Sequence, residues 1–372
     1  MDIPILIIYI SSIFLLIFLN KSIKKSFGGI YIITVFCYLI ASRSDKVPDT
    51  LMYLAYFNDE DTNFGYYRAI TGFEEGFRFF TKIIKTFTED SNIYMGAICI
   101  LNMLVINYSS KRIINNYNLE WGGESNKKII YFSSLLLLLY ISFFGIYVNA
   151  IVLRVGMAYS IIYYAASIAL DPQKKGYSKY IIIAFLLFVA YLMHSTAFIL
   201  GAIILSVLMF SKQLKRETYI ITLILIFLVY FLNLSTSIGI YLFKIIGSGD
   251  SAFAAKLDGY SSGFGALKSE GFSLKFLFFW SMSFVLSLNK KENKIYYKLL
   301  NILIIGVLIH SLFRSILLVE RITDYFTFYS FILFYLFLSS KKNLLFEFLL
   351  LLVIVVCQLI FILRITNLEL IA

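Results

Sequence analysis

The sequence YIIIAFLLFVAYLMHSTAFILGAIILSVLMF, residues 180–210, decides the class of this protein, because it contains no Asp, Glu, Lys or Arg. A membrane-spanning helix needs about 20 apolar residues, so this stretch is too long for one span and short for two. It predicts either a short helical hairpin with His194 near its tip or a single tilted helix. Both interpretations place the stretch in a lipid bilayer.

The composition of the whole chain supports the same conclusion. Of its 372 residues, 60% are hydrophobic, 18% are aromatic and only 15% are charged. An ordinary soluble domain contains about 25% charged residues. A core of this size cannot bury so much apolar surface, so the excess must face lipid. The composition therefore excludes a soluble enzyme, a disordered chain and a nucleic-acid binder.

Further apolar runs extend in both directions and predict an all-α, polytopic integral membrane protein. They lie at 3–19, 27–41, 92–109, 129–147, 155–170, 218–234, 273–288, 299–317, 325–339 and 344–362. We expect the first run to be a retained helix, because it lacks a small-residue cleavage site and another apolar run follows it. Residues 1–372 then form a single integral membrane domain with about 11–12 transmembrane helices.

Lysine-rich loops predict the orientation, because cytoplasmic loops carry the excess of Lys and Arg in membrane proteins. The net charge is +11, and the basic loops lie at 20–26, 110–128, 171–179, 211–217, 289–298 and 340–343. All six fall on the cytoplasmic side only if residues 180–210 cross the membrane twice. That gives twelve segments with both termini outside, and it makes the polar stretches 42–91 and 235–272 extracytoplasmic loops.

The outer half of the predicted bundle carries arginine, whereas the inner loops carry mostly lysine. The outer arginines are Arg43, Arg68, Arg78, Arg154, Arg314 and Arg321. The planar guanidinium suits bidentate contact with phosphate and stays charged when partly buried. We therefore predict a site for an anionic, lipid-linked ligand, with Arg154 and Arg321 as its main candidates. For each arginine alone, the alternative is snorkelling or pairing with an acidic residue.

Two histidines lie in apolar runs, and an ionisable side chain in a membrane segment is a functional hypothesis by default. His194 lies in the middle of residues 180–210. A neutral imidazole there can remove a proton from a sugar hydroxyl. The alternative is a histidine that bonds to the backbone of a neighbouring helix, which is the role we expect for His310. The three cysteines show neither a disulfide framework nor a metal-ligand spacing.

Seven short sequence features occur in a particular order along the chain. They are Arg43, DTLMY (49–53), FEEGF (73–77), LRVGMA (153–158), MHSTAF (193–198), KLDGY (256–260) and ERITDYF (320–326). In their order and spacing they resemble the EpsG-like family of polysaccharide polymerases, which includes many O-antigen polymerases of the Wzy type. The resemblance covers roughly residues 40–330. It departs at Val47 and Pro48, where such proteins often have a glycine before the aspartate of the first loop.

The resemblance implies an enzyme similar to lipid-dependent, metal-independent glycosyltransferases of the GT-C type. Such enzymes join oligosaccharide repeat units carried on undecaprenyl diphosphate, at the outer face of the bacterial cytoplasmic (inner) membrane. The implied partners are undecaprenyl-diphosphate-linked glycans, the lipid bilayer and a membrane protein that regulates chain length, without nucleic acid or a cofactor. The implied process is polysaccharide biosynthesis, as in the O-antigen of lipopolysaccharide.

The resemblance also implies roles for individual residues. The implied catalytic residues are His194, as the base or the group that orients the acceptor hydroxyl, with Glu75 and Asp49. The implied diphosphate-binding residues are Arg154, Arg321 and Arg43. The resemblance implies that Glu74 contacts sugar; the other predicted sugar-binding residues are Lys256 and the aromatic Tyr53 and Tyr260, whose rings can stack on sugar rings at the outer mouth.

Other functions remain open at this point. An O-antigen ligase uses the same chemistry with a lipid A core as acceptor, but ligases typically have a larger outer loop than residues 235–272. A flippase or transporter needs charges along a path through the membrane, whereas the inner halves of these spans are almost free of charge. A membrane acyltransferase is a weaker alternative, because no His-Asp pair occurs near His194 or His310.

Overall fold

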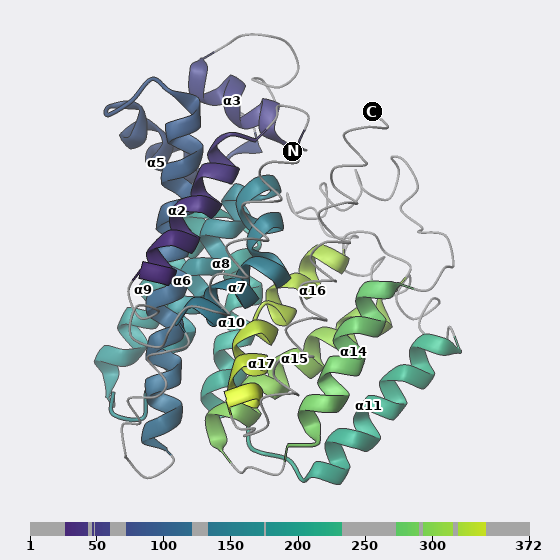
Figure 1. Ribbon diagram of the computed structural model, residues 1–372. Coiled ribbons are helices and arrows are strands. Elements are labelled where there is room, and N and C mark those ends of the chain that lie inside the picture. Colours follow the sequence, from purple (N-terminus) through teal and green to yellow (C-terminus); the bar gives the residue numbers. More distant parts are fainter. Residues whose placement is uncertain are drawn as a thin grey trace, which may run out of the picture. The chain divides into compact units, whose positions relative to one another are not determined.

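The structure is a computed structural model in which the described residues are entirely helical wherever they form regular structure (Figure 1). It describes residues 27–43, 47, 49–59, 72–120, 133–174, 176–232, 273–289, 293–314 and 319–339. The all-α prediction is confirmed for this part of the chain, in which no strand occurs. The predicted spans 3–19 and 344–362 and the loop 235–272 lie outside the described residues.

The chain divides into two compact units, one formed by residues 1–205 with 338–372 and the other by residues 206–337. The elements of the first unit are α2 (Phe27–Ala41), α3 (Thr50–Asn58), α5 (Glu75–Lys85), α6 (Ser91–Leu119), α7 (Ser133–Tyr140), η3 (Ile141–Gly145), η4 (Tyr147–Ile151), α8 (Leu153–Ala169), α9 (Tyr177–Met193) and most of α10 (Ala197–Phe210). The elements of the second are α11 (Arg216–Phe231), α14 (Leu274–Ser287), α15 (Lys294–Leu312), α16 (Val319–Thr327) and most of α17 (Ser330–Ser339).

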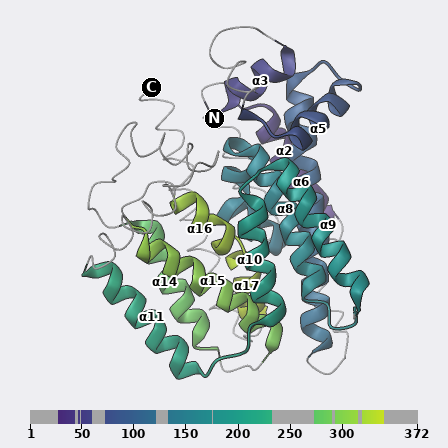
Figure 2. The ribbon, with the colours of Figure 1, turned by 180° about the vertical axis from the view of Figure 1, so that it is seen from behind.

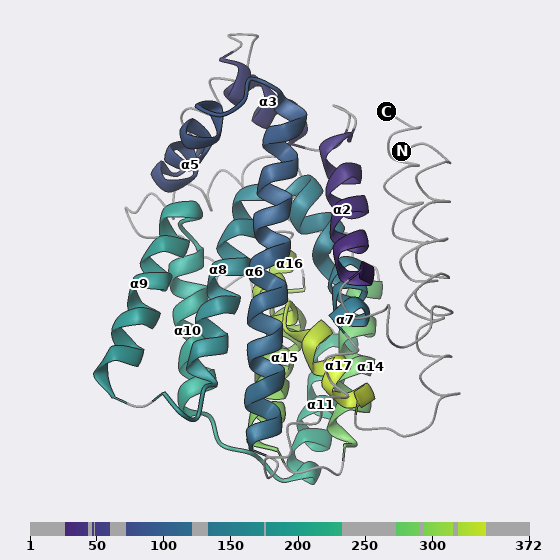
Figure 3. The same ribbon diagram turned by 60° about the vertical axis from the view of Figure 1, so that its left-hand side comes forward.

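Helix α8 is the centre of the first unit and packs against both α6 and α9 (Figure 3). Its sequence explains this position, because Ala158, Ala165 and Ala166 are small and fully buried. Small side chains let neighbouring helix backbones approach closely, which is how helices associate in membranes. On the other side of α6, the sulfur atoms of Cys37 and Cys99 lie 3.4 Å apart, and this contact joins α2 to α6.

The apolar stretch 180–210 folds as a helical hairpin, which was one of the two predicted interpretations. Helix α9 ends at Met193, His194 has extended backbone angles (φ −158°, ψ 117°), and α10 begins at Ala197. A Cβ added to Gly201 would lie 2.7 Å from Cδ1 of Leu187. Both residues lie seven positions from His194, so the two helices run back along each other with His194 at the turn.

Two described helices, Ser91–Leu119 and Lys294–Leu312, are long and apolar enough to cross a membrane. Shorter apolar helices occur at Gly29–Ala41, Leu136–Gly145, Tyr177–Met193, Ala197–Phe210 and Leu274–Ser287. Many of their large apolar side chains are exposed, which fits a surface that faces lipid. The number of crossings, about 11–12, and the GT-C-like architecture remain predictions.

The second unit is built around α15, which contacts α11, α14 and α16; α11, α14 and α15 run side by side (Figure 2). Trp280 of α14 donates a hydrogen bond to the carbonyl of Leu223 in α11 (2.8 Å). Ser311 of α15 donates a hydrogen bond to the carbonyl of Ile226, which also lies in α11 (3.0 Å). Gly306 allows α16 to approach, because an added Cβ would lie 2.7 Å from Cβ of Phe326.

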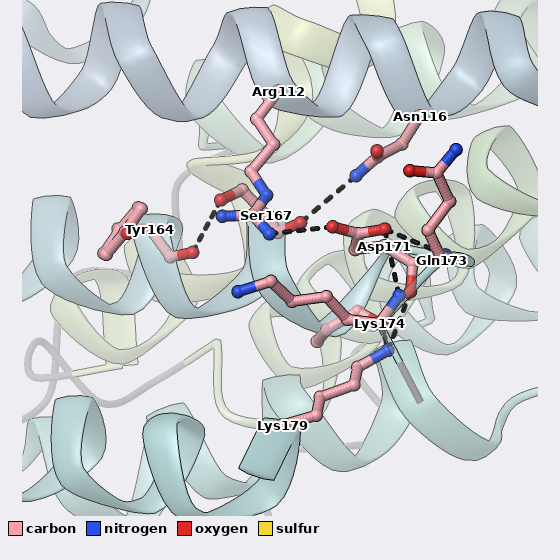
Figure 4. Close-up of polar contacts among 9 residues, drawn as sticks. Arg112, Asn116, Tyr164, Ser167, Asp171, Gln173, Lys174 and Lys179 are labelled. Atoms are coloured by element: carbon pink, nitrogen blue, oxygen red, sulfur yellow. Dashed lines mark hydrogen bonds and ion pairs between the residues drawn. The ribbon is translucent and has the colours of Figure 1, made fainter. Parts of the chain in front are cut away.

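An ion pair holds the connection between α8 and α9 (Figure 4). Arg112 of α6 contacts Asp171 at 2.7 Å, and Lys179 donates to the carbonyls of Ala169 (2.8 Å) and Asp171 (3.1 Å). These bonds satisfy carbonyl groups that the end of α8 leaves unpaired. Burial raises the pKa of Asp171, but the bonds from Arg112 and from two backbone N–H groups outweigh it, so the net pKa lies below its ordinary value.

Candidate functional site

Glu74, directly before α5, joins three parts of the first unit. Its Oε2 accepts a hydrogen bond from Nη1 of Arg154 in α8 at 2.6 Å. Its Oε1 accepts one from the backbone N–H of Ser195 at 3.2 Å and lies 3.1 Å from Nδ1 of His194. The start of α5, the start of α8 and the turn of the α9–α10 hairpin therefore meet at a single carboxylate. We call Glu74, Arg154, His194 and Ser195 the Glu74 cluster.

The cluster is largely buried but reaches the surface. The side chains of Glu74, Arg154 and His194 are 14%, 18% and 21% exposed. Burial by itself raises the pKa of Glu74, but the contacts with His194 and Arg154 and the Ser195 N–H outweigh it and lower the pKa to about 2. Glu74 is therefore ionised at neutral pH and is a poor proton acceptor there.

The His194 imidazole lies close to this carboxylate, but the contact is not a well-directed hydrogen bond. The approach of Nδ1 to Oε1 is close, but no group among the described residues offers Nδ1 a well-directed hydrogen bond. The contact becomes an ion pair when the ring is protonated. A carboxylate beside Nδ1 also favours the tautomer that carries its proton on Nδ1, which leaves Nε2 with a free lone pair.

Arg154 is the second residue of α8 and is held from several sides. Its Nη1 also donates to the carbonyl of Gly72 (2.6 Å), and its guanidinium carbon lies 4.6 Å from the centre of the Phe73 ring. It interacts as well with the hydroxyl of the buried Tyr53. Within the described part of the chain, its buried Nε has no hydrogen-bond partner. The unpaired N–H groups at the start of α8 add positive potential here.

The aromatic residues beside Arg154 are buried and pack against one another in the core. Tyr53 stacks on Phe73 with ring centres 5.3 Å apart and meets Phe77 edge-on at 5.8 Å. All three rings are buried. The structure thus places the ring of Tyr53, a predicted sugar-binding residue, in the core, where it helps to position Arg154.

Close packing between α5 and α9 puts Glu74 within reach of the hairpin turn. A Cβ added to Gly76 would lie 2.6 Å from Cβ and 2.8 Å from the carbonyl oxygen of Leu192, two residues before His194. Only glycine permits this approach. By contrast, a Cβ added to Gly72 would have nothing within 4 Å.

We therefore expect Gly76→Ala to push α5 away from α9 and to separate Glu74 from His194. The overpacking should cost about 1–3 kcal/mol of stability, measured as a lower thermal midpoint of the purified protein. Gly72→Ala, in open space, is the matched control and should behave like the wild type. Equal thermal midpoints for the two variants would contradict the close approach.

Arg43, a predicted diphosphate ligand, is occupied by the protein. Its Nε donates to Oγ1 of Thr50 (2.9 Å), its Nη1 donates to the carbonyl of Asn149 (3.0 Å), and its Nη2 lies 3.2 Å from the sulfur of Met95. Burial lowers its pKa to about 10, so it remains charged at neutral pH. Arg43 thus braces α2 against α3 and the π-helical turn η4.

The η4 turn belongs to a buried polar network that the sequence analysis missed. Asn149 of η4 donates to the hydroxyl of Tyr140 (3.0 Å) and accepts from the amide of Asn102 (3.0 Å), which in turn accepts from Ser160 (3.1 Å). π-Helical turns often occur at functional sites. Here the network fixes the segment that leads directly into the start of α8 and Arg154.

The remaining predicted site residues are Asp49, Glu75, Arg321, Lys256 and Tyr260. Asp49 is exposed and has a positive φ of 63°, while the 79% exposed side chain of Glu75 pairs with Arg78. Arg321 lies in α16 of the second unit, with an exposed side chain. Lys256 and Tyr260 lie outside the described residues.

The second unit has polar contacts of its own. His310 is buried, with its ring 5.7 Å from that of Phe276. Lys275 contacts the buried Asp324 at 2.6 Å. Arg314 donates to the carbonyl of Tyr230 (3.0 Å). The Lys275–Asp324 pair was not predicted, because 48 residues separate its members in the sequence.

Comparison with known proteins identifies a family. A family model described as the EpsG family matches residues 29–371, which is nearly the whole chain. No curated protein and no solved structure matches the sequence.

Proposed function

The chain belongs to the EpsG family, a Wzy-like family of polymerase-type membrane proteins, and from this premise we propose its reaction. The protein joins undecaprenyl-diphosphate-linked oligosaccharide repeat units on the outer face of the bacterial cytoplasmic membrane. The observation that carries this proposal is the Glu74 cluster. It combines a positioned guanidinium with a histidine at the turn of an apolar hairpin.

The guanidinium of Arg154 suits the leaving group of this reaction. The bond between the anomeric carbon of the growing chain and its diphosphate oxygen breaks, and negative charge develops on the departing lipid diphosphate. A fixed donor aimed at this charge lowers the barrier without reorganising during the reaction. The contacts with Glu74 and the Gly72 carbonyl fix the positive charge of Arg154 before the reaction, and the start of α8 adds its dipole.

His194 suits the acceptor side of the same reaction. A hydroxyl at the non-reducing end of the incoming unit forms the new bond to the anomeric carbon. Its proton passes to Nε2 of His194, because the other ring nitrogen, Nδ1, faces the Glu74 carboxylate. The growing chain thus moves onto the new unit, and the freed carrier leaves as the lipid diphosphate. The proposal needs no metal ion and no nucleotide sugar.

In this proposal Glu74 positions the two groups that react, instead of binding sugar. Its pKa of about 2 makes it a poor base. Its two oxygens contact Arg154 on one side and the His194–Ser195 turn on the other. The diphosphate-binding role of Arg321 stays a prediction.

Analysis of lipid-linked glycans in cells that lack the protein tests the proposed function. We expect single repeat units to accumulate on undecaprenyl diphosphate at the outer face, and long polymer to be absent. Long polymer that stays attached to its carrier would instead identify a ligase. Single units confined to the cytoplasmic face would identify a flippase. Either of these two results would overturn the proposal.

A further inference from the structure

Helix α5 exposes an apolar stripe although it lies in a polar stretch of the sequence. Phe79, Ile83 and Phe87 are 67%, 41% and 85% exposed. They are spaced four residues apart, so they lie on one face of the helix and of the turn that follows it. The opposite face of α5 is buried in the first unit by Phe77 and Ile84.

A cationic stripe lies beside the apolar one. Arg78, Lys82 and Lys85 are spaced by four and three residues, so they share a second face, on which Arg78 and Lys85 are half-buried and Lys82 is exposed. Arg78 pairs with Glu75, and Lys85 pairs with Asp59. The exposed Lys82 is the cation of this stripe best placed to attract an anionic partner.

We propose that α5 lies in the outer headgroup layer of the bilayer. Its apolar stripe inserts among the upper parts of the acyl chains, and its cations face anionic lipid headgroups. A helix with one apolar face, one cationic face and aromatic side chains is the usual form of a segment that lies in the plane of the membrane interface. The apolar stripe matches the acyl-chain region and the cationic stripe matches the anionic headgroup region, and the two regions meet at this depth. This match favours lipid over a protein as the partner of α5.

Aromatic side chains at the hairpin turn mark the same depth independently. Tyr191 is stacked on Phe188 and meets Phe198 edge-on, and all three rings are exposed. Tyrosine is enriched at the headgroup level of membrane proteins, so Tyr191 marks this depth. Helix α5 lies against this end of α9, where Gly76 approaches Leu192 (Figure 3).

The consequence for the site rests on the proposed function. Glu74 directly precedes α5, so an α5 in the headgroup layer places the Glu74 cluster at the depth of the lipid phosphates. The diphosphate of a lipid carrier then reaches Arg154 while its polyprenyl chain stays in the bilayer. Helix α5 sets this depth.

Tryptophan quenching by brominated lipids tests the position of α5. Phe79→Trp is made in a full-length protein whose Trp121 and Trp280 are replaced by phenylalanine, and the protein is reconstituted into phosphatidylcholine–phosphatidylglycerol vesicles. Leu225→Trp, in the middle of α11, is the matched control for a residue in the acyl core. A single peak in size-exclusion chromatography and a thermal midpoint close to that of the wild type show that each purified variant folds.

We expect F79W to lose more fluorescence to lipids brominated near the headgroup than to lipids brominated near the terminal methyl group, and L225W to show the reverse order. Replacing phosphatidylglycerol by phosphatidylcholine should weaken the shallow quenching of F79W, and the additional Lys82→Ser change should remove this dependence on lipid charge. Quenching reports position whether or not the protein makes polymer, so it is independent of the proposed function.

Three results would overturn the proposal. The first is a lack of quenching of F79W fluorescence by any brominated lipid, because water, a second copy or another protein would then cover the stripe. The second is stronger quenching of F79W by the deep bromines, which would place α5 in the acyl core. The third is an unchanged dependence on lipid charge after Lys82→Ser, which would remove the headgroup contact.

Discussion

Arg154→Lys is expected to lower the rate of chain extension by about 10²–10³-fold, the cost of losing one preorganised donor in a transition state. Lysine keeps the positive charge but not the planar fork. It cannot contact Glu74 and the Gly72 carbonyl while also offering a third donor to the diphosphate. The rate is measured with purified protein and a lipid-linked repeat unit, at equal amounts of folded protein.

The control for Arg154→Lys is the same change in an arginine–carboxylate pair of the first unit that lies outside the Glu74 cluster. Arg112 and Asp171 lie near the C-terminal end of α8, roughly 25 Å from Arg154 by the rise of the helix. Arg112→Lys should extend chains at nearly the wild-type rate. If both variants lost activity equally, or if Arg154→Lys kept the wild-type rate, Arg154 would have only a structural role.

Glu74→Gln is expected to abolish most chain extension and to destabilise the protein. Glutamine fills the same space but leaves the Arg154 charge without its partner and His194 without a carboxylate at Nδ1. Removing one member of a largely buried ion pair costs about 3–5 kcal/mol. Because Glu74 positions both reacting groups, the loss should appear in the turnover rate more than in the affinity for the lipid-linked unit.

The pH dependence of stability separates this role from simple packing. Interactions lower the pKa of Glu74 from 4.5 to about 2 in the folded protein, so its ionised form stabilises the fold above the unfolded pKa. This contribution is lost as the pH falls from about 4.5 toward 2, and the shift corresponds to about 3 kcal/mol. The difference in thermal midpoint between wild type and Glu74→Gln should therefore be large at pH 6 and should shrink at pH 3.

Asp171→Asn provides the matched comparison, because it removes the carboxylate of an ion pair outside the Glu74 cluster. It should destabilise the protein without lowering the turnover rate of the folded fraction. A Glu74→Gln protein that turns over at the wild-type rate would show that Glu74 positions nothing in the reaction. A difference in thermal midpoint that is the same at pH 6 and pH 3 would contradict the ionic character of the cluster.

Part of this organisation could be predicted from the sequence, because it follows from local patterns. The absence of charge over residues 180–210 and the basic loops on either side favoured a hairpin, and the structure forms one at His194. The choice of Arg154 and His194 as candidates also came from local reasoning about charge in apolar surroundings. Their meeting through Glu74 could not be predicted, because it depends on the close approach that Gly76 allows between α5 and α9.

The roles of other residues depended on structure that no sequence pattern indicates. Arg43 is an outer arginine by its sequence position, but its Nη1 donates a hydrogen bond to the carbonyl of Asn149 in a π-helical turn. Tyr53 was predicted to bind sugar because a tyrosine ring can stack on a sugar ring, but this ring packs against Phe73 and Phe77 in the core. Burial and hydrogen-bond partners of this kind arise only when distant segments pack together.

Chain extension by the purified protein tests the central claim most directly. The protein is reconstituted into vesicles with a single undecaprenyl-diphosphate-linked repeat unit and no nucleotide sugar, and the products are separated by length. We predict a ladder of polymers from the wild type and from Arg112→Lys. His194→Ala should give no polymer, although it still binds the lipid-linked unit. A folded wild-type protein that leaves the intact lipid-linked unit unextended would contradict the account. A His194→Ala protein that produces the wild-type ladder would contradict it as well.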